Sequence, residues 1–386
     1  MVVPRFGPEV VGGAEALARA LAHRATGPDI AVEVATTCAI DHQTWENVLP
    51  EGQARDGDVV VHRFPVSAGD TRRQARLAGR LARGGRLSYL EELELLATSV
   101  WSRRLQRFVQ ERADGYDLVV CTPYLFGVPF WAAQAAPART ALIPCLHDEP
   151  QAHLRVVRSL IGQVRGCLFN SAGERRLAER LYGPQRGGVV GMGFDPPAAP
   201  ARAGFAARHG LGTYILYAGR IEEAKRVDVL AAHVARYRRE RRSDLSLALI
   251  GRGPWRPRVR DAEAVRRIGF VDEKEKRSAY AEAAALVNPS ALESLSIVLL
   301  EAWLEGTPAI VSSDSDVLAE HVASSGGGLA FADYPGFAAA LDTILGDPGA
   351  ARAMGEAGRA YVGERYSWSA VGARFRDTVG ALAAAG

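Results

Sequence analysis

Residues 217–226, Tyr-Ala-Gly-Arg-Ile-Glu-Glu-Ala-Lys-Arg, place two cations where they could bind a diphosphate. An apolar run ends just before Arg220, and Lys225 follows near the start of the next helical stretch. Both side chains could therefore converge on one anion at the carboxyl end of a strand. The alternative is a solvated loop in which Arg220 pairs with Glu222 or Glu223.

Residues 288–302 place two glutamates around the start of a helix. Glu293 lies in the loop after a strand, and Glu301 follows just over two helical turns further on, where it suits a ribose diol. The early helical amides attract phosphate or hydroxyl oxygens, and they belong to Ser294, Leu295, Ser296, Ile297 and Val298. Alternatively, Glu293 caps the helix and Glu301 is exposed.

Two candidates lie in the first half of the chain. Gly12 and Gly13 end a loop before a helix, where glycine lets the backbone approach a diphosphate; the alternative is a flexible loop. The strand before them starts almost at the first residue, so we expect it to be short. His147 opens a strand-end loop, although an isolated histidine is more often structural.

An arginine stripe follows between residues 72 and 86. Arg72, Arg76, Arg80 and Arg83 share one predicted helical face, with Arg73 and Arg86 beside it and Leu77 and Leu81 opposite. Such a stripe suits an anionic lipid surface or an anionic acceptor. The alternative is a solvated face.

The elements that position these residues form an α/β pattern of two domains. A length of 386 residues favours two domains, and short apolar runs alternate with helical stretches such as 14–24 and 91–112. A Pro- and Gly-rich linker after Gly191 separates a first domain, 1–193, from a second, 194–365. Expected strands are 30–37, 59–64, 118–122, 142–146, 166–170 and 188–190 in the first domain, and 214–218, 245–251, 266–271, 285–289, 308–312 and 329–331 in the second. An amphipathic helix in 366–386 is expected to pack back on the first domain.

Composition excludes several classes of protein. Apolar residues make up 48% and charged residues 24%, and no apolar run is long enough for a membrane span. No secretory signal is visible, so we expect a cytoplasmic protein, with reduced cysteines buried on strands and no metal cluster. A net charge of +3 does not favour nucleic acid. Lysine is rare, at positions 225, 274 and 276 only, which favours a binding role for Lys225.

The second domain resembles a known family. Glu293 to Glu301, ESLSIVLLE, is similar to the Glu-x7-Glu motif of retaining family four glycosyltransferases, which have the GT-B fold of two Rossmann-like domains facing a cleft. GRIEEAK resembles their diphosphate element, and with GFVD and GTPAIVSS the resemblance covers most of residues 214–331. This sequence departs from the family pattern at Arg226, where glycine is frequent, and at residues 313–316, which replace a turn of small residues.

The resemblance implies roles for the candidate residues. Arg220 and Lys225 would bind the diphosphate, Glu301 the ribose and Glu293 the sugar hydroxyls, with Val271 beside the base. His147 would contact the donor sugar and stabilise positive charge on its anomeric carbon, with Asp148 or Glu149 nearer the acceptor.

The function that follows is transfer of a hexose from a UDP- or GDP-sugar to an acceptor hydroxyl with retention of configuration. The acceptor is a glycan, a lipid-linked molecule or a small molecule, and neither a metal nor a tightly bound cofactor is expected. Two alternatives are a nucleotide-sugar epimerase or phosphorylase of the same fold, and a two-domain ligand-sensing protein. Glu293 and Glu301 disfavour the sensing protein, because passive binding does not need both carboxylates at this spacing.

Overall fold

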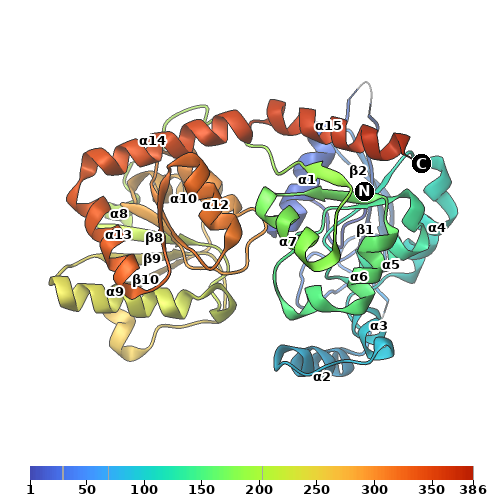
Figure 1. Ribbon diagram of the computed structural model, residues 1–386, viewed down its shortest axis with the longest axis horizontal. Helices are drawn as coiled ribbons and strands as arrows, with labels where there is room; N and C mark the ends of the chain where they lie inside the picture. Colours follow the sequence, from blue (N-terminus) through green and yellow to red (C-terminus); the bar gives the residue numbers. More distant parts are fainter. Residues whose placement is uncertain (28–29, 68, 202, 386) are drawn as a thin grey trace. The chain divides into compact units, whose positions relative to one another are not determined.

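The computed structural model describes residues 1–27, 30–67, 69–201 and 203–385. The chain forms two compact units: unit 1 contains Met1–Gly193 and Trp368–Gly386, and unit 2 contains Phe194–Ser367. Both ends of the chain therefore belong to unit 1 (Figure 1). Unit 2 is continuous in sequence, and its two ends are tied together because the Phe194 amide donates to the Tyr366 carbonyl at 2.7 Å.

Unit 1 is built on a sheet in two parts, ordered β1-β3-β2 and β4-β5-β6-β7. Val2 forms parallel bridges to Ala35 of the first part and to Cys121 of the second, so the expected short first strand joins them. The strands are β1 (Glu33–Thr37), β2 (Gly52–Asp56), β3 (Val59–Phe64), β4 (Val119–Cys121), β5 (Thr140–Leu142), β6 (Gly166–Phe169) and β7 (Gly187–Val189). Only β2 runs antiparallel to its neighbour among the described pairs.

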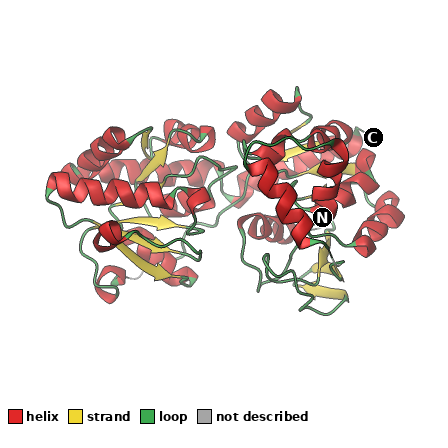
Figure 2. Ribbon diagram, turned by 90° about the horizontal axis from the view of Figure 1, so that it is seen from below, coloured by secondary structure: helices red, strands yellow, loops and turns green. Residues whose placement is uncertain are grey.

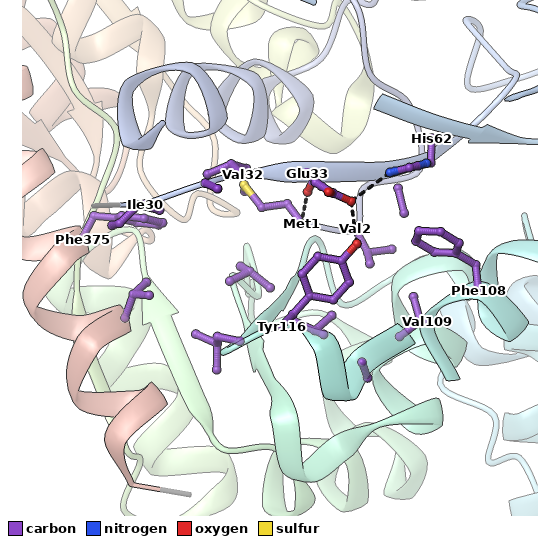
Figure 3. A pocket seen from close by; sticks show the side chains of 17 residues that line it. Met1, Val2, Ile30, Val32, Glu33, His62, Phe108, Val109, Tyr116 and Phe375 are labelled. Atoms are coloured by element: carbon purple, nitrogen blue, oxygen red, sulfur yellow. Dashed lines mark hydrogen bonds and ion pairs between the residues drawn. The ribbon is translucent and has the colours of Figure 1, made fainter. Parts of the chain in front are cut away.

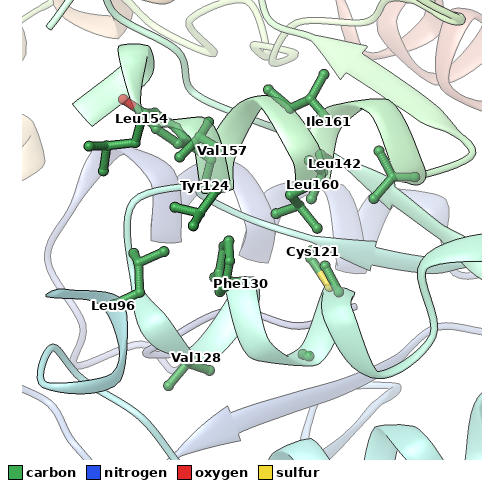
Figure 4. Packing of buried hydrophobic residues seen from close by; sticks show 14 of the residues in the cluster. Leu96, Cys121, Tyr124, Val128, Phe130, Leu142, Leu154, Val157, Leu160 and Ile161 are labelled. Atoms are coloured by element: carbon green, nitrogen blue, oxygen red, sulfur yellow. The ribbon is translucent and has the colours of Figure 1, made fainter. Parts of the chain in front are cut away.

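Helices enclose this sheet and build the main core of unit 1. They are α1 (Gly13–Ala25), α2 (Thr71–Ala82), α3 (Tyr89–Ala97), α4 (Arg103–Arg112), α5 (Gly127–Ala135), α6 (Arg155–Gln163) and α7 (Ala172–Tyr182), with short 3-10 turns η1 (Ala113–Gly115), η2 (Pro137–Arg139) and η3 (Pro150–His153). Phe130 of α5, Leu142 of β5 and Leu160 of α6 lie in one apolar cluster and are each 1% exposed (Figure 4). Burial of such side chains supplies most of the stabilisation of the fold.

Unit 2 has one fully parallel sheet, ordered β10-β9-β8-β11-β12-β13, with helices packed around it (Figure 2). Its strands are β8 (Tyr214–Ala218), β9 (Ser246–Ile250), β10 (Val265–Gly269), β11 (Ala285–Asn288), β12 (Ala309–Ser312) and β13 (Gly328–Phe331). The helices are α8 (Phe205–Arg208), α9 (Val227–Arg241), α10 (Glu273–Glu282), α11 (Ile297–Leu304), α12 (Asp316–Ser325), α13 (Tyr334–Gly346) and α14 (Pro348–Arg365), with 3-10 turns η4 (Glu223–Lys225) and η5 (Val259–Ala264). Every residue of β8, β9, β11 and β12 is buried, as a parallel sheet covered on both faces requires.

The final helix, α15 (Trp368–Ala384), packs on unit 1 through the apolar stripe that the sequence predicts. Val371, Phe375 and Leu382 are buried, and the helix contacts α1, β6 and β7. The Arg374 Nη2 atom donates to the Val190 carbonyl at 2.9 Å, which fixes the helix beside the end of β7. A segment that follows all of unit 2 in sequence is thus part of the unit 1 core.

Two expectations about single elements are wrong, and one strand was not expected. The strand expected at 142–146 is β5 at Thr140–Leu142, because Pro144 has no amide hydrogen and Cys145 has a left-handed φ of 51°. The helix expected at 91–112 is broken between α3 and α4, where the Ser102 hydroxyl caps α4. Strand β2, Gly-Gln-Ala-Arg-Asp, was not expected because it has no apolar run.

We expect α15 to stabilise unit 1 rather than unit 2. Phe375→Ala should destabilise unit 1 by about 3–5 kcal/mol, because the ring is buried against unit 1. Deleting residues 368–386 should have a larger effect. Hydrogen exchange of the β6 and β7 amides, measured by mass spectrometry, would report the change. Asp377→Ala, at an exposed position of the same helix, is the control. Unchanged exchange in the deletion variant would show that α15 does not support unit 1.

Candidate functional site

The candidate site of unit 2 forms where β8 and β11 end. These strands are parallel neighbours, so the loops after them leave the sheet at the same edge. The loop after β8 is fixed by the Tyr217 hydroxyl, which donates to the Arg220 carbonyl at 2.7 Å. It also lies against the loop after β9, where a Cβ atom on Gly251 would come within 1.9 Å of the Gly219 carbonyl oxygen. Glycine at that position is therefore needed for the close approach of the two loops.

Lys225 and Glu293 meet at this edge, whereas the sequence predicts that Lys225 converges with Arg220. The Lys225 Nζ atom lies 2.9 Å from Glu293 Oε1 and donates to the Leu292 carbonyl at 2.9 Å. A longer contact of 3.4 Å reaches the Ser290 hydroxyl. The two charged side chains are 18% and 14% exposed, so the pair is largely shielded from water but still accessible.

Arg220 does not join this pair. Its guanidinium lies 3.0 Å from Glu222 Oε1 and is 64% exposed, which is the ion pair of the alternative interpretation. An exposed pair of this kind contributes at most about 1 kcal/mol, so an anionic ligand could replace it at little cost. Arg226, which follows Lys225 in the loop, has a left-handed φ of 55° and pairs with Asp314.

The start of α11 is organised by polar contacts within its own loop. Ser296 has a left-handed φ of 65°, and its side chain makes no capping hydrogen bond to the helix. Instead, the Asn288 amide donates to the Ser296 hydroxyl at 3.0 Å. The loop thus presents Ser294 to Val298 at the end of β11, and the first helical turn keeps amides that its N-cap side chain does not satisfy.

Glu301 is largely buried and held by two donors from α10. Lys276 Nζ donates to Oε1 at 2.8 Å, and the Tyr280 hydroxyl donates to Oε2 at 2.9 Å. Burial raises the pKa of Glu301, and the positive charge of Lys276 opposes that shift. The alternative of a fully exposed Glu301 is wrong, since its side chain is only 19% exposed. Neither donor was predicted from the sequence, although the rarity of lysine was a signal for Lys276.

Val271 lies between β10 and α10 and is half-buried. The Asp272 side chain caps α10 by accepting from the Glu275 amide at 2.8 Å. Beside it, the Phe270 ring is 54% exposed, and the Arg252 guanidinium stacks over it at 4.7 Å from the ring centroid. An accessible aromatic surface thus adjoins the position that the resemblance assigns to the base.

In unit 1, Gly12 has an intramolecular reason to be glycine. A Cβ atom there would come within 2.1 Å of Glu15 Oε2 and 3.2 Å of Arg5 Nη2. Arg5 and Glu15 form a buried ion pair of 2.6 Å, which the sequence analysis did not anticipate. Gly13 is the first residue of α1. The close packing of this pair, in addition to any ligand, therefore requires the absence of a side chain at Gly12.

His147 stands in the loop after β5 with one neighbouring carboxylate. Its Nδ1 atom is 3.5 Å from Glu149 Oε1, and Glu149 also accepts from the Tyr124 hydroxyl at 3.0 Å. Asp148 is engaged elsewhere, with His153 at 2.8 Å and Arg180 at 3.3 Å. Of the two acids after the histidine, Glu149 is therefore the one whose side chain lies beside His147.

Glu174 fixes the backbone just before His147. This buried carboxylate accepts from the Leu146 amide at 2.5 Å and from the Asn170 amide at 2.5 Å, and so joins the ends of β5 and β6. Burial raises its pKa to about 8, although both amide hydrogen bonds favour the charged form. Glu174 lies in the first turn of α7, and its contacts with the Leu146 and Asn170 amides were not predicted from the sequence.

The arginine stripe is smaller than expected. Helix α2 ends at Ala82, Arg73 makes two hydrogen bonds to Glu94 and Arg80 pairs with Glu91 at 2.5 Å. In the part of the chain that the structure describes, no ion pair involves the exposed arginines of this segment, which are Arg72, Arg76, Arg83 and Arg86. Leu77 and Leu81 are buried on the opposite face, as expected.

A separate cavity of about 100 Å³ lies in unit 1 beside the first residues of β1 and β4. Figure 3 shows Tyr116 and His62 pointing at Glu33, whose Oε2 atom lies 2.6 and 2.9 Å from them. Most of the lining is apolar, including Phe108, Val109 and Phe375. Its polar groups satisfy one another, and the cavity contains none of the predicted site residues.

Among the described residues, neither a candidate metal site nor a helix that could cross a membrane is found. No group of three or more His, Cys, Asp or Glu side chains there could hold a metal ion. The four cysteines are free; Cys38, Cys121 and Cys167 are buried and Cys145 is half-buried, and Cys38 and Cys145 lie in loops rather than on strands. Within the same described ranges, no helix combines the length and the apolar character that crossing a membrane requires.

His321 connects the Glu293 loop to the helices behind it. Its Nε2 atom donates to the Leu295 carbonyl at 3.0 Å, and the Tyr361 hydroxyl lies 3.2 Å from Nδ1. Burial lowers the pKa of His321 from 6.5 to about 4. The pKa of His321 is lower in the folded state than in the unfolded state. The contribution of His321 to the free energy of unfolding is therefore fully present above about pH 6.5 and is lost as the pH falls toward 4.

We therefore expect His321 to make unit 2 acid-sensitive. Lowering the pH from 7.5 to 5.0 should reduce the free energy of unfolding of the wild type by about 2 kcal/mol more than that of a His321→Gln variant. Urea unfolding at both pH values would measure this difference. The control is His42→Gln, at an exposed position of unit 1. An equal loss in the wild type and in His321→Gln would exclude His321 as the group responsible.

The sequence of this chain is similar to those of several glycosyltransferases. The family model for "Glycosyl transferases group 1" matches residues 212–347. D-inositol 3-phosphate glycosyltransferase 2 of Catenulispora acidiphila is 30% identical over 302 residues, covering 68% of this chain and 70% of the relative. Glycogen synthase of Mycobacterium tuberculosis is 33% identical over 166 residues, 41% of this chain, and the match spans only 40% of that relative.

The solved structures show the same fold. Sucrose-phosphate synthase of Thermosynechococcus elongatus superimposes with a TM-score of 0.72 at 19% identity, covering 97% of this chain and 94% of that one. At this identity the likeness concerns the fold alone. The GT-B fold class predicted from the sequence is confirmed.

Proposed function

Because this chain belongs to the glycosyl transferases group 1 family, we propose that it moves a hexose from a UDP- or GDP-sugar to an acceptor hydroxyl with retention of configuration. The observation that carries this proposal is the meeting of Lys225 and Glu293 at the ends of the parallel strands β8 and β11. Both residues lie in the segment that the family model matches. A cation and a carboxylate side by side suit a donor with a diphosphate and a sugar on adjacent atoms.

In our proposal, groups of this chain neutralise the negative charge of the leaving diphosphate. Lys225 has three N–H donors, and its contact with Ser290, at 3.4 Å, is the one most easily exchanged for a phosphate oxygen. Arg220 can exchange its exposed pair with Glu222 for a second oxygen. With the first amides of α11, these groups would do the electrostatic work that a divalent ion does elsewhere, so the reaction needs no metal.

The remaining residues take the roles that the resemblance implies. Glu293, held by Lys225, would bind the sugar hydroxyls, and Glu301 the ribose. His147 would contact the donor sugar and stabilise positive charge on the anomeric carbon, and Gly12 and Gly13 would let the backbone approach the diphosphate. Retention implies attack from the face that the phosphate leaves, with the phosphate taking the acceptor proton.

Slow hydrolysis of UDP- or GDP-hexoses tests this proposal without knowledge of the acceptor. We expect Lys225→Ala and Arg220→Ala to lower kcat by on the order of a hundredfold, because the diphosphate gains charge in the transition state. Glu301→Ala should instead raise KM by about 10- to 100-fold, because the ribose is bound equally before and during reaction. Proton NMR of the freshly released hexose would give its configuration and test retention.

The matched control is Lys274→Ala, which removes the exposed lysine of α10. It should leave both constants unchanged. A Lys225→Ala enzyme with full kcat and normal donor affinity would place Lys225 outside the reaction. An inverted product would refute retention, and turnover that forms an epimerised nucleotide sugar would favour the epimerase.

We also propose that the arginine face of α2 contacts an anionic lipid surface. Its support is the absence of ion pairs, among described residues, at Arg72, Arg76, Arg83 and Arg86, whereas Glu91 and Glu94 are occupied by other arginines. Beside them at the start of α3, Tyr89 and Leu90 are 45% and 75% exposed. Basic and apolar side chains together are the combination that interfacial binding uses.

Binding to vesicles that contain phosphatidylglycerol should weaken with salt, because each surface arginine contributes about 1 kcal/mol. Replacing Arg72, Arg76, Arg83 and Arg86 by Gln should lower the partition coefficient by on the order of a hundredfold or more. Activity on a soluble acceptor should persist. Four exposed arginines of unit 2, Arg239, Arg242, Arg258 and Arg352, changed to Gln, serve as the control. Equal binding by both variants would make the α2 face a solvated one, and loss of activity with unchanged binding would indicate an anionic acceptor.

A further inference from the structure

Two neighbouring residues of α10 bind two acids near the end of α11 in different ways. Lys276 donates to one oxygen of Glu301, Oε1, at 2.8 Å. Arg277 binds Glu305 through Nε at 2.5 Å and through Nη2 at 3.4 Å, and so engages both of its oxygens. Both pairs connect the same two helices, but they leave the two carboxylates with different capacities to accept further hydrogen bonds.

A carboxylate has about four acceptor positions. At Glu301 one position is filled by Lys276 and one by Tyr280, which lies one helical turn further along α10. Each oxygen of Glu301 thus keeps a lone pair for another donor. The forked guanidinium of an arginine at position 276 would compete for both oxygens, whereas the point charge of a lysine occupies one.

The use of lysine here stands out in this chain. Lysine and arginine together number 47, yet lysine occurs only at 225, 274 and 276. Two of those three bind the carboxylates of the Glu-x7-Glu motif, Lys225 at Glu293 and Lys276 at Glu301. Elsewhere, arginines engage both oxygens of carboxylates in pairs such as Arg19 with Asp56 and Arg241 with Asp342. The two acids proposed to bind the donor are therefore paired with lysine, whose charge is a single point, and not with the forked guanidinium of arginine.

We propose that Lys276 is a positioning residue for nucleotide recognition: it orients Glu301 and keeps it a charged acceptor whose free lone pairs bind the two hydroxyls of a ribose. The inference rests on the proposed function, because that proposal gives Glu301 the ribose. It adds that ribose recognition depends on a second residue, which the Glu-x7-Glu motif does not include. The Lys276 side chain is 22% exposed, so it is largely shielded from solvent where it contacts Glu301.

The test compares nucleotides with and without the ribose hydroxyls. Calorimetry would give the Kd of UDP, of GDP and of the 2′,3′-dideoxy form of each. Wild type should prefer the ribonucleotide by about 10- to 100-fold, the effect of hydrogen bonds to a charged group. In Lys276→Met this preference should fall to about threefold or less, while affinity for the dideoxy form changes little. At saturating donor, kcat for hydrolysis should remain near that of wild type.

Arg277→Met is the matched control, because it removes the adjacent ion pair between the same two helices. It should lower the unfolding midpoint and leave the ribose preference intact. Tyr280→Phe, which removes the other donor to Glu301, should reduce the preference and gives a second variant if Lys276→Met does not fold.

The outcomes separate the two proposals. A wild-type protein that binds neither UDP nor GDP would refute the donor site and this inference together. If wild type prefers the ribonucleotide and Lys276→Met keeps the same preference, Lys276 is only a structural ion-pair partner and the inference fails, although the donor site stands. A weaker affinity for both nucleotides with an unchanged ratio would also overturn it.

Discussion

Strands β8 and β11 are parallel neighbours, and this constraint determines where the charged side chains of unit 2 lie. Parallel strands release their loops at a common edge, so Lys225 and Glu293 meet although 68 positions separate them in the sequence. Their contact in turn fixes the loop before α11, together with Asn288 and Ser296. Left-handed φ values at Arg226 and Ser296, which are costly for residues other than glycine, occur beside these two residues. The packing of the parallel sheet holds that geometry in place.

Both lysine–glutamate pairs of unit 2 are partly withdrawn from water, and this makes them sensitive to the loss of either member. Removing one partner from a buried pair leaves an uncompensated charge, which costs more than the pair itself contributes. At Glu301 this is visible in the opposing effects of burial and of Lys276 on its pKa. Each of the two carboxylates thus contacts a lysine and remains 14–19% exposed, so both can still accept hydrogen bonds.

The sequence was sufficient for features that depend on short-range patterns. Buried parallel strands are nearly continuous apolar runs, so β8, β9, β11 and β12 were located within a few residues, and the stripe of α15 followed from its period. That Lys225 and Glu293 stand at strand ends also followed, but their direct contact did not, because the sequence predicted that Lys225 converges with Arg220. What the sequence did not reveal were partners inside helices. Lys276, Tyr280, His321 and Glu174 each lie in an amphipathic helix, and which loop such a residue reaches depends on how its helix is rotated on the sheet. Strand β2 and the break before α4 were missed because neither has an apolar signature.

The place of α15 has a consequence for how the chain is made. Unit 1 includes residues 1–193 and the final helix, whereas unit 2 lies between them. During synthesis, the whole of unit 2 therefore leaves the ribosome before the helix that covers β6 and β7 becomes available. Unit 2 is continuous and can fold as its own sequence emerges. Throughout that interval, the surface on which Val371, Phe375 and Leu382 later pack has no cover, and unit 1 is completed only by a segment that is translated after the whole of unit 2.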